Sequence, residues 1–306
     1  MKRHAWLDRI HQLDPETDFT EIYRISSQYE FPWDTNQSLG FALYRTYAVP
    51  SIGRLLARTG EFTERTQKRY DDTVLILDAV VEHGFDSAQG REAIRRMNQM
   101  HRRYDISDED YLYVLSTFVV VPKRWLDEYG WRPYSPHELR AAVNYYRELG
   151  RHMGLRDIPE TYQEFERLLD DYERAHFGFD QGGRDVSDAT LALTASWYPE
   201  AFGGAVHTAS ICLLDDPLRE AFGYPRPPAL LRKAVRSALR LRGRVVRLLP
   251  PRRKPAPARE SSQVRGYPNG YRLSELGTFE ESGGCPFKAA DPTPTDGTDP
   301  GHVSPR

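Results

Sequence analysis

The hydrophobic positions of the chain recur mostly with the period of an α-helix. Between Asp71 and Glu82 apolar residues fall three or four positions apart beside apolar neighbours, which predicts a buried helix. A second apolar stripe runs from residue 90 to residue 104, while the arginines of this stretch fall on other faces. The stripe consists of Ile94, Met97, His101 and Tyr104. The pattern therefore predicts a helix on which His101 points inward.

The stretch from Asp108 to Tyr129 begins with acidic residues, which suit a helix N-terminus, and continues as a long apolar run. Its β-branched triplet, residues 119–121, is also compatible with a strand. No alternating segments surround it, however, and a lone strand is not stable. We therefore expect a helix that is broken or kinked near Pro122.

Further helices follow from capping signals and spacing. Ser135 begins a capping box with Glu138, which opens a helix to about Met153 before Gly154 stops it. Helical spacing also predicts the ranges 159–177, 188–197 and 232–247, the last of them strongly basic and closed by two prolines. Gly182-Gly183 is interpreted as a turn. Because no β-rich region competes, the predicted fold class is all-α.

Length and composition predict one main domain. A chain of 306 residues with 39% hydrophobic content can bury a sizeable core, and we expect a single helical domain over residues 1–254. Residues 255–281 are expected to form an extended C-terminal segment. Pro, Gly, Ser, Thr and Asp dominate residues 282–306, so this stretch is predicted to be a disordered tail.

Composition also limits the cellular setting and the partners. No uncharged apolar run of about 18 residues exists, and the N-terminus lacks the apolar stretch of a signal peptide. Cys212 and Cys285 are too far apart for the usual thiolate metal site and too few for a disulfide framework. We therefore expect a soluble, cytoplasmic protein.

The charge balance bears on larger partners. The net charge of -2 gives no global attraction to nucleic acid, so no nucleic-acid partner is expected. The basic stretch 232–254 is compatible with a weak peripheral contact with anionic membranes. The interpretation that we favour is that its arginines pair with acidic groups of the same protein. The sequence does not determine the oligomeric state.

Six short segments occur in a fixed order between residues 41 and 165. They read FALYRTYAVPSIGRLLARTGEF (41–62), KRYDDT (68–73), MHRRY (100–104), YVLSTFV (113–119), YYRELGRHMGL (145–155) and IPETYQEF (158–165). The ordered set resembles the MpaB and rubber-oxygenase catalytic-domain family over roughly residues 30–251. The late segment YPNGYRLSELG (267–277) is also similar to bacterial members.

This resemblance implies a globin-like helical core around a pocket for haem b, and an oxygenase that cleaves isoprenoid double bonds with dioxygen. The family's proximal iron ligand corresponds to His101. Its conserved arginine and threonine correspond to Arg69 and Thr73, which implies contacts with the haem propionates and with dioxygen. Where the rubber-cleaving branch has a lysine before the threonine, this chain has Asp72. That branch's upstream glutamate base has no equivalent here, so the mechanism of rubber cleavage does not transfer directly.

Each of these residues also has an ordinary structural interpretation. A histidine that binds haem iron needs a neutral imidazole on a packed element and a hydrogen-bond acceptor for its other ring nitrogen, but an inward His101 also fits a core histidine bonded to a neighbour. Arg69 and Thr73 share a helix face, where Arg69 could instead pair with an acid such as Asp72 or Glu64. Thr117, polar within an apolar run, is a third catalytic candidate, and a bond back to its own helix is equally compatible.

A rival chemistry starts from Glu173 and His176, an i, i+3 pair of the kind found in carboxylate-bridged di-iron sites. Such a site needs a second pair and two further glutamates, none of which the sequence supplies. The sequence also lacks the P-loop, dinucleotide-binding, nucleophile-elbow and HExxH zinc motifs. The pair is therefore interpreted as an exposed helix turn.

The leading functional hypothesis is a haem-b oxygenase that uses dioxygen to oxidise or cleave an apolar, isoprenoid- or lipid-like substrate. A non-catalytic haem carrier or sensor on the same fold is the alternative, since fold and cofactor do not fix activity. A helical interaction protein without a cofactor is the third hypothesis.

Overall fold

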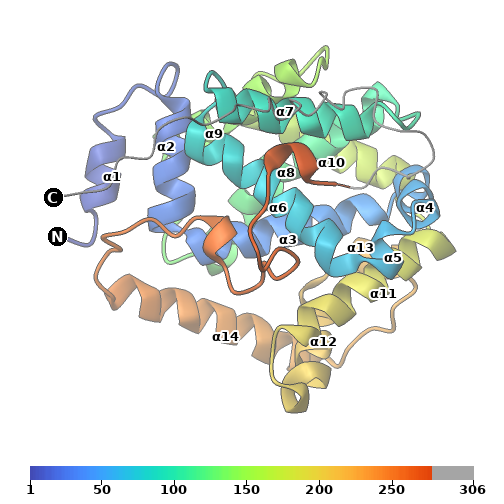
Figure 1. Cartoon of the computed structure of the whole chain (residues 1–306). Helices are drawn as coiled ribbons and strands as arrows, with labels where there is room; N and C mark the ends of the chain where they lie inside the picture. The colour runs from blue at the N-terminus through green and yellow to red at the C-terminus, as the bar shows by residue number, and fades with distance from the viewer. Residues whose placement is uncertain (278–306) are drawn as a thin grey trace, which may run out of the picture.

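The computed structural model describes residues 1–277, and the all-α prediction is confirmed there (Figure 1). The predicted tail and the last four residues of the predicted extended segment lie outside the described residues. The α-helices are α1 (Ala5–Ile10), α2 (Phe19–Ile25), α3 (Pro32–Tyr47), α4 (Pro50–Arg58), α5 (Glu61–Glu64), α6 (Thr66–His83), α7 (Ala88–His101), α8 (Asp108–Tyr129), α9 (Pro136–His152), α10 (Tyr162–His176), α11 (Gln181–Ser196), α12 (Glu200–Leu213), α13 (Asp216–Ala221) and α14 (Ala229–Leu248).

The helices that periodicity and caps predicted are present. Helices α6, α7, α9, α10 and α14 match the predicted ranges within a few residues, and Ser135 forms its capping box with Glu138. Tyr104, by contrast, lies beyond the end of α7 and is 40% exposed, so it is not part of the inward stripe. In the described part of the chain, no helix is long and apolar enough to cross a bilayer.

Helix α8 runs unbroken through Pro122, so of the two predicted alternatives, a break or a kink, the break is wrong. A proline inside a helix removes one hydrogen bond and costs about 3 kcal/mol. The turns beyond it bury Trp125, Leu126 and Tyr129 against neighbouring elements. This burial offsets the cost of the proline, because each large apolar side chain contributes roughly 1.5–3 kcal/mol.

The interpretation of Gly182-Gly183 as a turn is also wrong, because both residues lie in the first turn of α11. Asp180 caps this helix by accepting a bond from the Gly183 amide. A Cβ at Gly183 would lie 2.3 Å from the carbonyl oxygen of Tyr47, and one at Gly53 would lie 2.7 Å from the Cα of Gly183. The glycines therefore allow α4 and α11 to pack with their backbones in contact.

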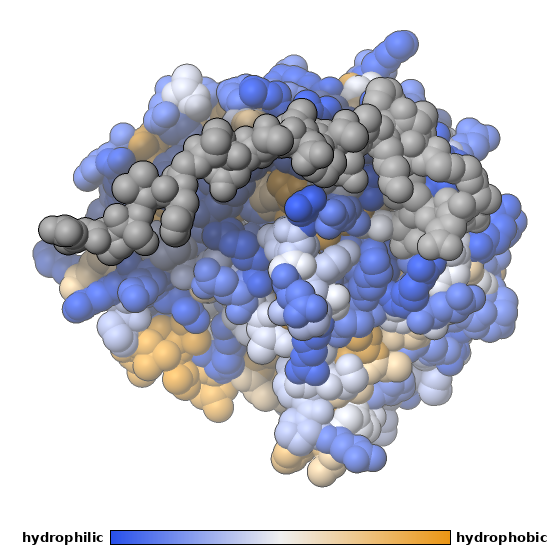
Figure 2. Space-filling model, in the orientation of Figure 1, coloured by the Kyte–Doolittle hydropathy of each residue, from blue (hydrophilic) through white to orange (hydrophobic). Residues whose placement is uncertain are grey.

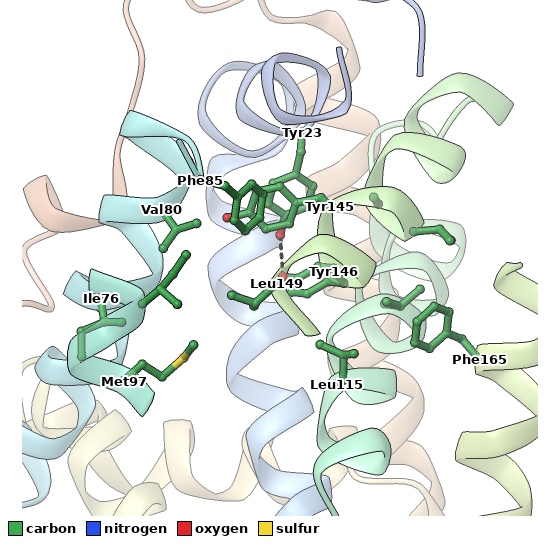
Figure 3. Close-up of a cluster of buried hydrophobic side chains, with 14 of the residues drawn as sticks. Tyr23, Ile76, Val80, Phe85, Met97, Leu115, Tyr145, Tyr146, Leu149 and Phe165 are labelled. Carbon is green, nitrogen blue, oxygen red and sulfur yellow. Dashed lines mark hydrogen bonds between the residues drawn. The ribbon is translucent and has the colours of Figure 1, made fainter. Parts of the chain in front are cut away.

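The core consists of several apolar clusters. The largest joins α6, α7, α8, α9 and α10, and Figure 3 shows part of it, including the 2.7 Å hydrogen bond between the hydroxyl groups of Tyr23 and Tyr146. A second cluster joins α3, α11 and α13. Helix α8 links the two regions, since it packs against α3 as well as against α9 and α10.

The C-terminal segment 255–277 is held against α6, as Figure 1 shows in orange to red. Asp78 of α6 accepts bonds from the Ala258 amide at 2.7 Å and from the Arg259 guanidinium at 2.8 Å. The amides of Arg265 and Gly266 donate to Asp71. The segment therefore supplies hydrogen bonds that buried carboxylates of α6 require.

We predict that Gly183→Ala destabilises the fold by about 1–3 kcal/mol, because the new methyl group would overlap a backbone carbonyl that cannot move aside. Gly204→Ala in α12 is the matched control, since no atom lies within 4 Å of the position that a Cβ would take there. Alanine should leave stability there unchanged or raise it by up to about 1 kcal/mol. Chemical denaturation measures both, and equal effects would contradict the close packing of α4 and α11.

Candidate functional site

A cavity of about 290 Å³ lies between α4, α6, α7 and α8. Its inner wall is apolar and includes residues of the main core cluster, namely Ile76, Met97, Leu115 and Leu149 (Figure 3). Its lining also includes the exposed residues Arg103, Tyr104 and Asp105, so the cavity reaches the surface at the end of α7. The volume lies just below the usual range for small-molecule pockets, about 300–1,000 Å³.

His101 is the last residue of α7 and lines this cavity. Its Nδ1 atom is buried and, among the described residues, has no hydrogen-bond partner. Burial, and secondly the positive charge of Arg69, lower the pKa of His101 to about 4. The imidazole is therefore neutral at physiological pH and keeps a lone pair for a ligand. Within residues 1–277 Nδ1 therefore has neither the partner that an ordinary core histidine could bond there nor the acceptor that a haem ligand needs at its other ring nitrogen.

Arg69 and Thr73 lie one turn apart on α6 and line the same cavity. The Arg69 guanidinium donates to the Thr73 hydroxyl, and its Cζ lies 4.8 Å above the Phe62 ring. None of the ion pairs within residues 1–277 joins Arg69 to a carboxylate, whereas Asp72 pairs with Lys68. The sequence-predicted trio of His101, Arg69 and Thr73 is thus brought to one cavity.

Thr117 is not brought to this cavity. Its side chain is fully buried in α8 and donates to the Val114 carbonyl at 2.7 Å, which is the back-bond that the sequence left open. Two other histidines near the helix ends, His83 and His152, do not line the cavity either. His152 stacks on Phe85 with ring centroids 5.4 Å apart.

Asp72 is a buried residue of the cavity wall whose surroundings the sequence did not indicate. Its carboxylate accepts a bond from Lys68 Nζ at 2.8 Å and another from the Tyr267 hydroxyl. Lys68 also donates to the Gly277 carbonyl at 3.1 Å, and Gly277 itself lines the cavity. The C-terminal segment therefore forms part of the wall. The only signal for this was the sequence resemblance of residues 267–277.

A second cavity of about 100 Å³ lies beside the first. Both cavities are lined by Leu43, Tyr47, Phe62, Arg69 and Thr73, which together form the partition. The remaining lining of the second cavity is rich in aromatic and apolar side chains from α3, α11 and α12, including Phe41, Tyr44, Leu193, Trp197 and Leu213. The Arg69–Thr73 pair therefore faces two adjoining, largely apolar chambers.

The candidate di-iron pair does not form a site. Glu173 points inward, where its carboxylate pairs with Arg45 and accepts a bond from the Tyr113 hydroxyl. His176 is exposed and stacks on Tyr172. No group of three or more potential metal-binding side chains occurs in residues 1–277. Glu173 instead neutralises the charge of the buried Arg45 guanidinium, and this role is structural.

Comparison with known families places the chain in one of them. The profile described as "ER-bound oxygenase mpaB/B'/Rubber oxygenase, catalytic domain" matches residues 37–248. The chain belongs to this family. The match includes α6 and α7, so the mpaB/rubber-oxygenase catalytic domain contains His101, Arg69 and Thr73.

Several fungal proteins are similar to the chain. ER-bound oxygenase mpaB' of Penicillium brevicompactum is 30% identical over 253 residues, which cover 77% of this chain and 60% of that protein. ER-bound oxygenase mpaB of Penicillium roqueforti is 29% identical over 222 residues, which cover 67% of this chain and 74% of that protein. The chain thus spans about three fifths of the length of the P. brevicompactum relative.

We predict that Asp72→Ala lowers the free energy of unfolding by about 1–3 kcal/mol, because it leaves the Tyr267 hydroxyl and Lys68 without their buried acceptor. Asp127→Ala is the matched control, since Asp127 also pairs with a lysine one turn away but is 40% exposed. Asp127→Ala should lower the free energy of unfolding by less than about 1 kcal/mol.

The two variants are compared by urea denaturation, with hydrogen exchange of residues 258–277 as the local measurement. Exchange in this segment should rise in Asp72→Ala alone. Similar losses of stability and unchanged exchange in both variants would show that Asp72 does not anchor the segment.

Proposed function

We propose that this protein is a haem-b-dependent oxygenase that uses dioxygen to oxidise or cleave an apolar, isoprenoid- or lipid-like substrate. Membership of an oxygenase catalytic-domain family supports the reaction class. One observation supports the choice of cofactor. His101, a neutral histidine in the wall of the largely apolar cavity, has a buried ring nitrogen without a partner.

The side chains of the lining support the proposal of a haem. His101 would hold the iron of a bound haem, because its low pKa makes the neutral imidazole available without the cost of removing a proton. Two cationic side chains of the lining, Arg69 and Arg58, are suited to propionate groups. Haem b, when bound, would supply the redox chemistry that activates dioxygen.

The protein's own groups have more limited tasks. Apolar side chains from α4 and α8, such as Ile52, Val114 and Phe118, exclude water and hold apolar carbon. The Thr73 hydroxyl accepts from the Arg69 guanidinium and donates to the Arg69 carbonyl at 3.1 Å. We propose that it would turn from this carbonyl to orient a small polar ligand at the partition. Asp72 is committed to Lys68 and Tyr267, so we assign it no part in binding iron.

The second cavity is the proposed place for part of the substrate. It is mostly apolar, it adjoins the His101 cavity, and the two share the Arg69–Thr73 partition. An alkene-bearing chain seated there would approach the first cavity past a guanidinium and a hydroxyl. A non-catalytic haem carrier would have no need of this chamber, so tests of it also separate the two hypotheses.

We predict that His101→Ala loses most bound haem while its helix content is unchanged, because a methyl group cannot coordinate iron and alanine is a good helix former. His176→Ala is the control, since that histidine is exposed on α10. The pyridine haemochrome assay measures haem per chain, and circular dichroism reports the fold. Full haem content and an unchanged Soret band in His101→Ala would refute the assignment.

Filling the second cavity should impair substrate use without removing haem. Thr194 lines only that chamber of the two, and Thr194→Phe places a ring in it. We expect haem content to stay within the wild-type range and farnesol-dependent oxygen uptake to fall about tenfold or more. Thr208→Phe, at an exposed position of α12, is the control. Unchanged uptake in Thr194→Phe would exclude this chamber as the substrate site.

A further inference from the structure

Helix α14 carries apolar side chains on two opposite faces. On its inner face Leu239 and Val246 pack on the cluster around Trp125, and Gly243 lies against the backbone of Tyr129. On the outer face, large apolar side chains remain exposed: Leu230 at 82%, Leu241 at 58%, Val245 at 50% and Leu248 at 85%. One side of the helix is thus buried, and the other presents apolar groups to solvent.

The exposed apolar residues form one stripe. The stripe consists of Leu230, Leu241, Val245 and Leu248, which are eleven, four and three positions apart. Spacings of this kind return to the same side of an α-helix. Leu249 adds a further side chain, 52% exposed, just after the helix. Figure 2 shows a large hydrophobic area at the lower left, over the C-terminal end of α14. Contiguous exposed apolar surface of this kind marks an interaction site.

A row of cations borders the stripe. Lys233, Arg240, Arg244 and Arg247 are separated by seven, four and three positions, so they follow the same helical line on the adjoining face. All four are exposed. Three more exposed cations, residues 252–254, follow the helix. Helix α14 contains no acidic residue.

The inner cations of the same helix have different roles. Arg242 donates to Asp34 at 2.7 Å, and Arg232 pairs with Asp216. Arg240, although it belongs to the outer row, also donates to an acid of the same protein, Glu128, at 2.9 Å. The sequence-based expectation that the arginines pair with acidic groups of the same protein therefore applies to this inner set and to Arg240. By contrast, no ion pair within residues 1–277 involves Lys233, Arg244 or Arg247. These outer cations remain available to an anionic partner.

We propose that the outer face of α14 binds an anionic phospholipid surface, with the leucine stripe inserted at the acyl boundary and the cationic row on the headgroups. An exposed apolar stripe beside cations is the pattern of helices that lie in the membrane interface. A second copy of the chain fits less well, because pairing the stripes would bring rows of like charge together without an acid on either helix. Lipid binding does not depend on haem, so this inference stands apart from the proposed function.

Co-sedimentation of the full chain with vesicles of phosphatidylcholine, with or without phosphatidylglycerol, tests the proposal. The wild-type chain should bind the anionic vesicles, and binding should weaken as salt is raised. Leu241→Ser with Leu248→Ser should lower binding about tenfold or more. Arg244→Gln with Arg247→Gln should lower it by a similar factor for the anionic vesicles only.

Matched controls keep the test specific. Phe179→Ser changes another exposed large apolar side chain, 59% exposed and away from α14. Arg151→Gln with Arg174→Gln removes two exposed charges on other helices. Both controls should bind like the wild type. Absence of wild-type binding, equal losses in the controls, or a dimer in sedimentation velocity that the leucine variant dissociates would overturn the proposal.

Discussion

Helix α6 sets two requirements that the rest of the structure has to meet. One face carries Arg69 and Thr73 to the cavity, while the opposite face carries Asp71 and Asp78 into the protein interior. Buried carboxylates are costly unless they are paired or hydrogen-bonded. Burial raises the pKa of both Asp71 and Asp78, and the bonds from residues 258–266 act against that rise. The position of the cavity wall thus depends on a segment almost two hundred residues away in sequence.

The same segment also reaches the helix that carries His101. Leu276 is fully buried in the main core cluster, and Arg96 of α7 donates to its carbonyl. Gly277 lies against Met100, next to His101, where a Cβ would overlap the methionine sulfur. The C-terminal segment therefore ties α6 and α7 together, and these two helices supply the three side chains that the family resemblance singled out.

Sequence patterns predicted most of the helices because a buried face imposes the 3.6-residue period whatever it packs against. They predicted that His101 points inward for the same reason. They did not predict the burial of Asp71, Asp72 and Asp78, because an acidic residue within an apolar face resembles a surface residue until its distant partner is known. The role of Gly183 was missed likewise, since a glycine that allows close packing and a glycine in a turn look identical in sequence.

The central claim is that His101 and its cavity hold one haem b. Titration of haem into the purified full chain, prepared without cofactor and followed at the Soret band, tests it most directly. We predict saturation at one haem per chain and a ferrous form whose spectrum shows a histidine-ligated iron. A chain that stays colourless with excess haem, or one whose absorbance rises without a stoichiometric end point, would contradict the account.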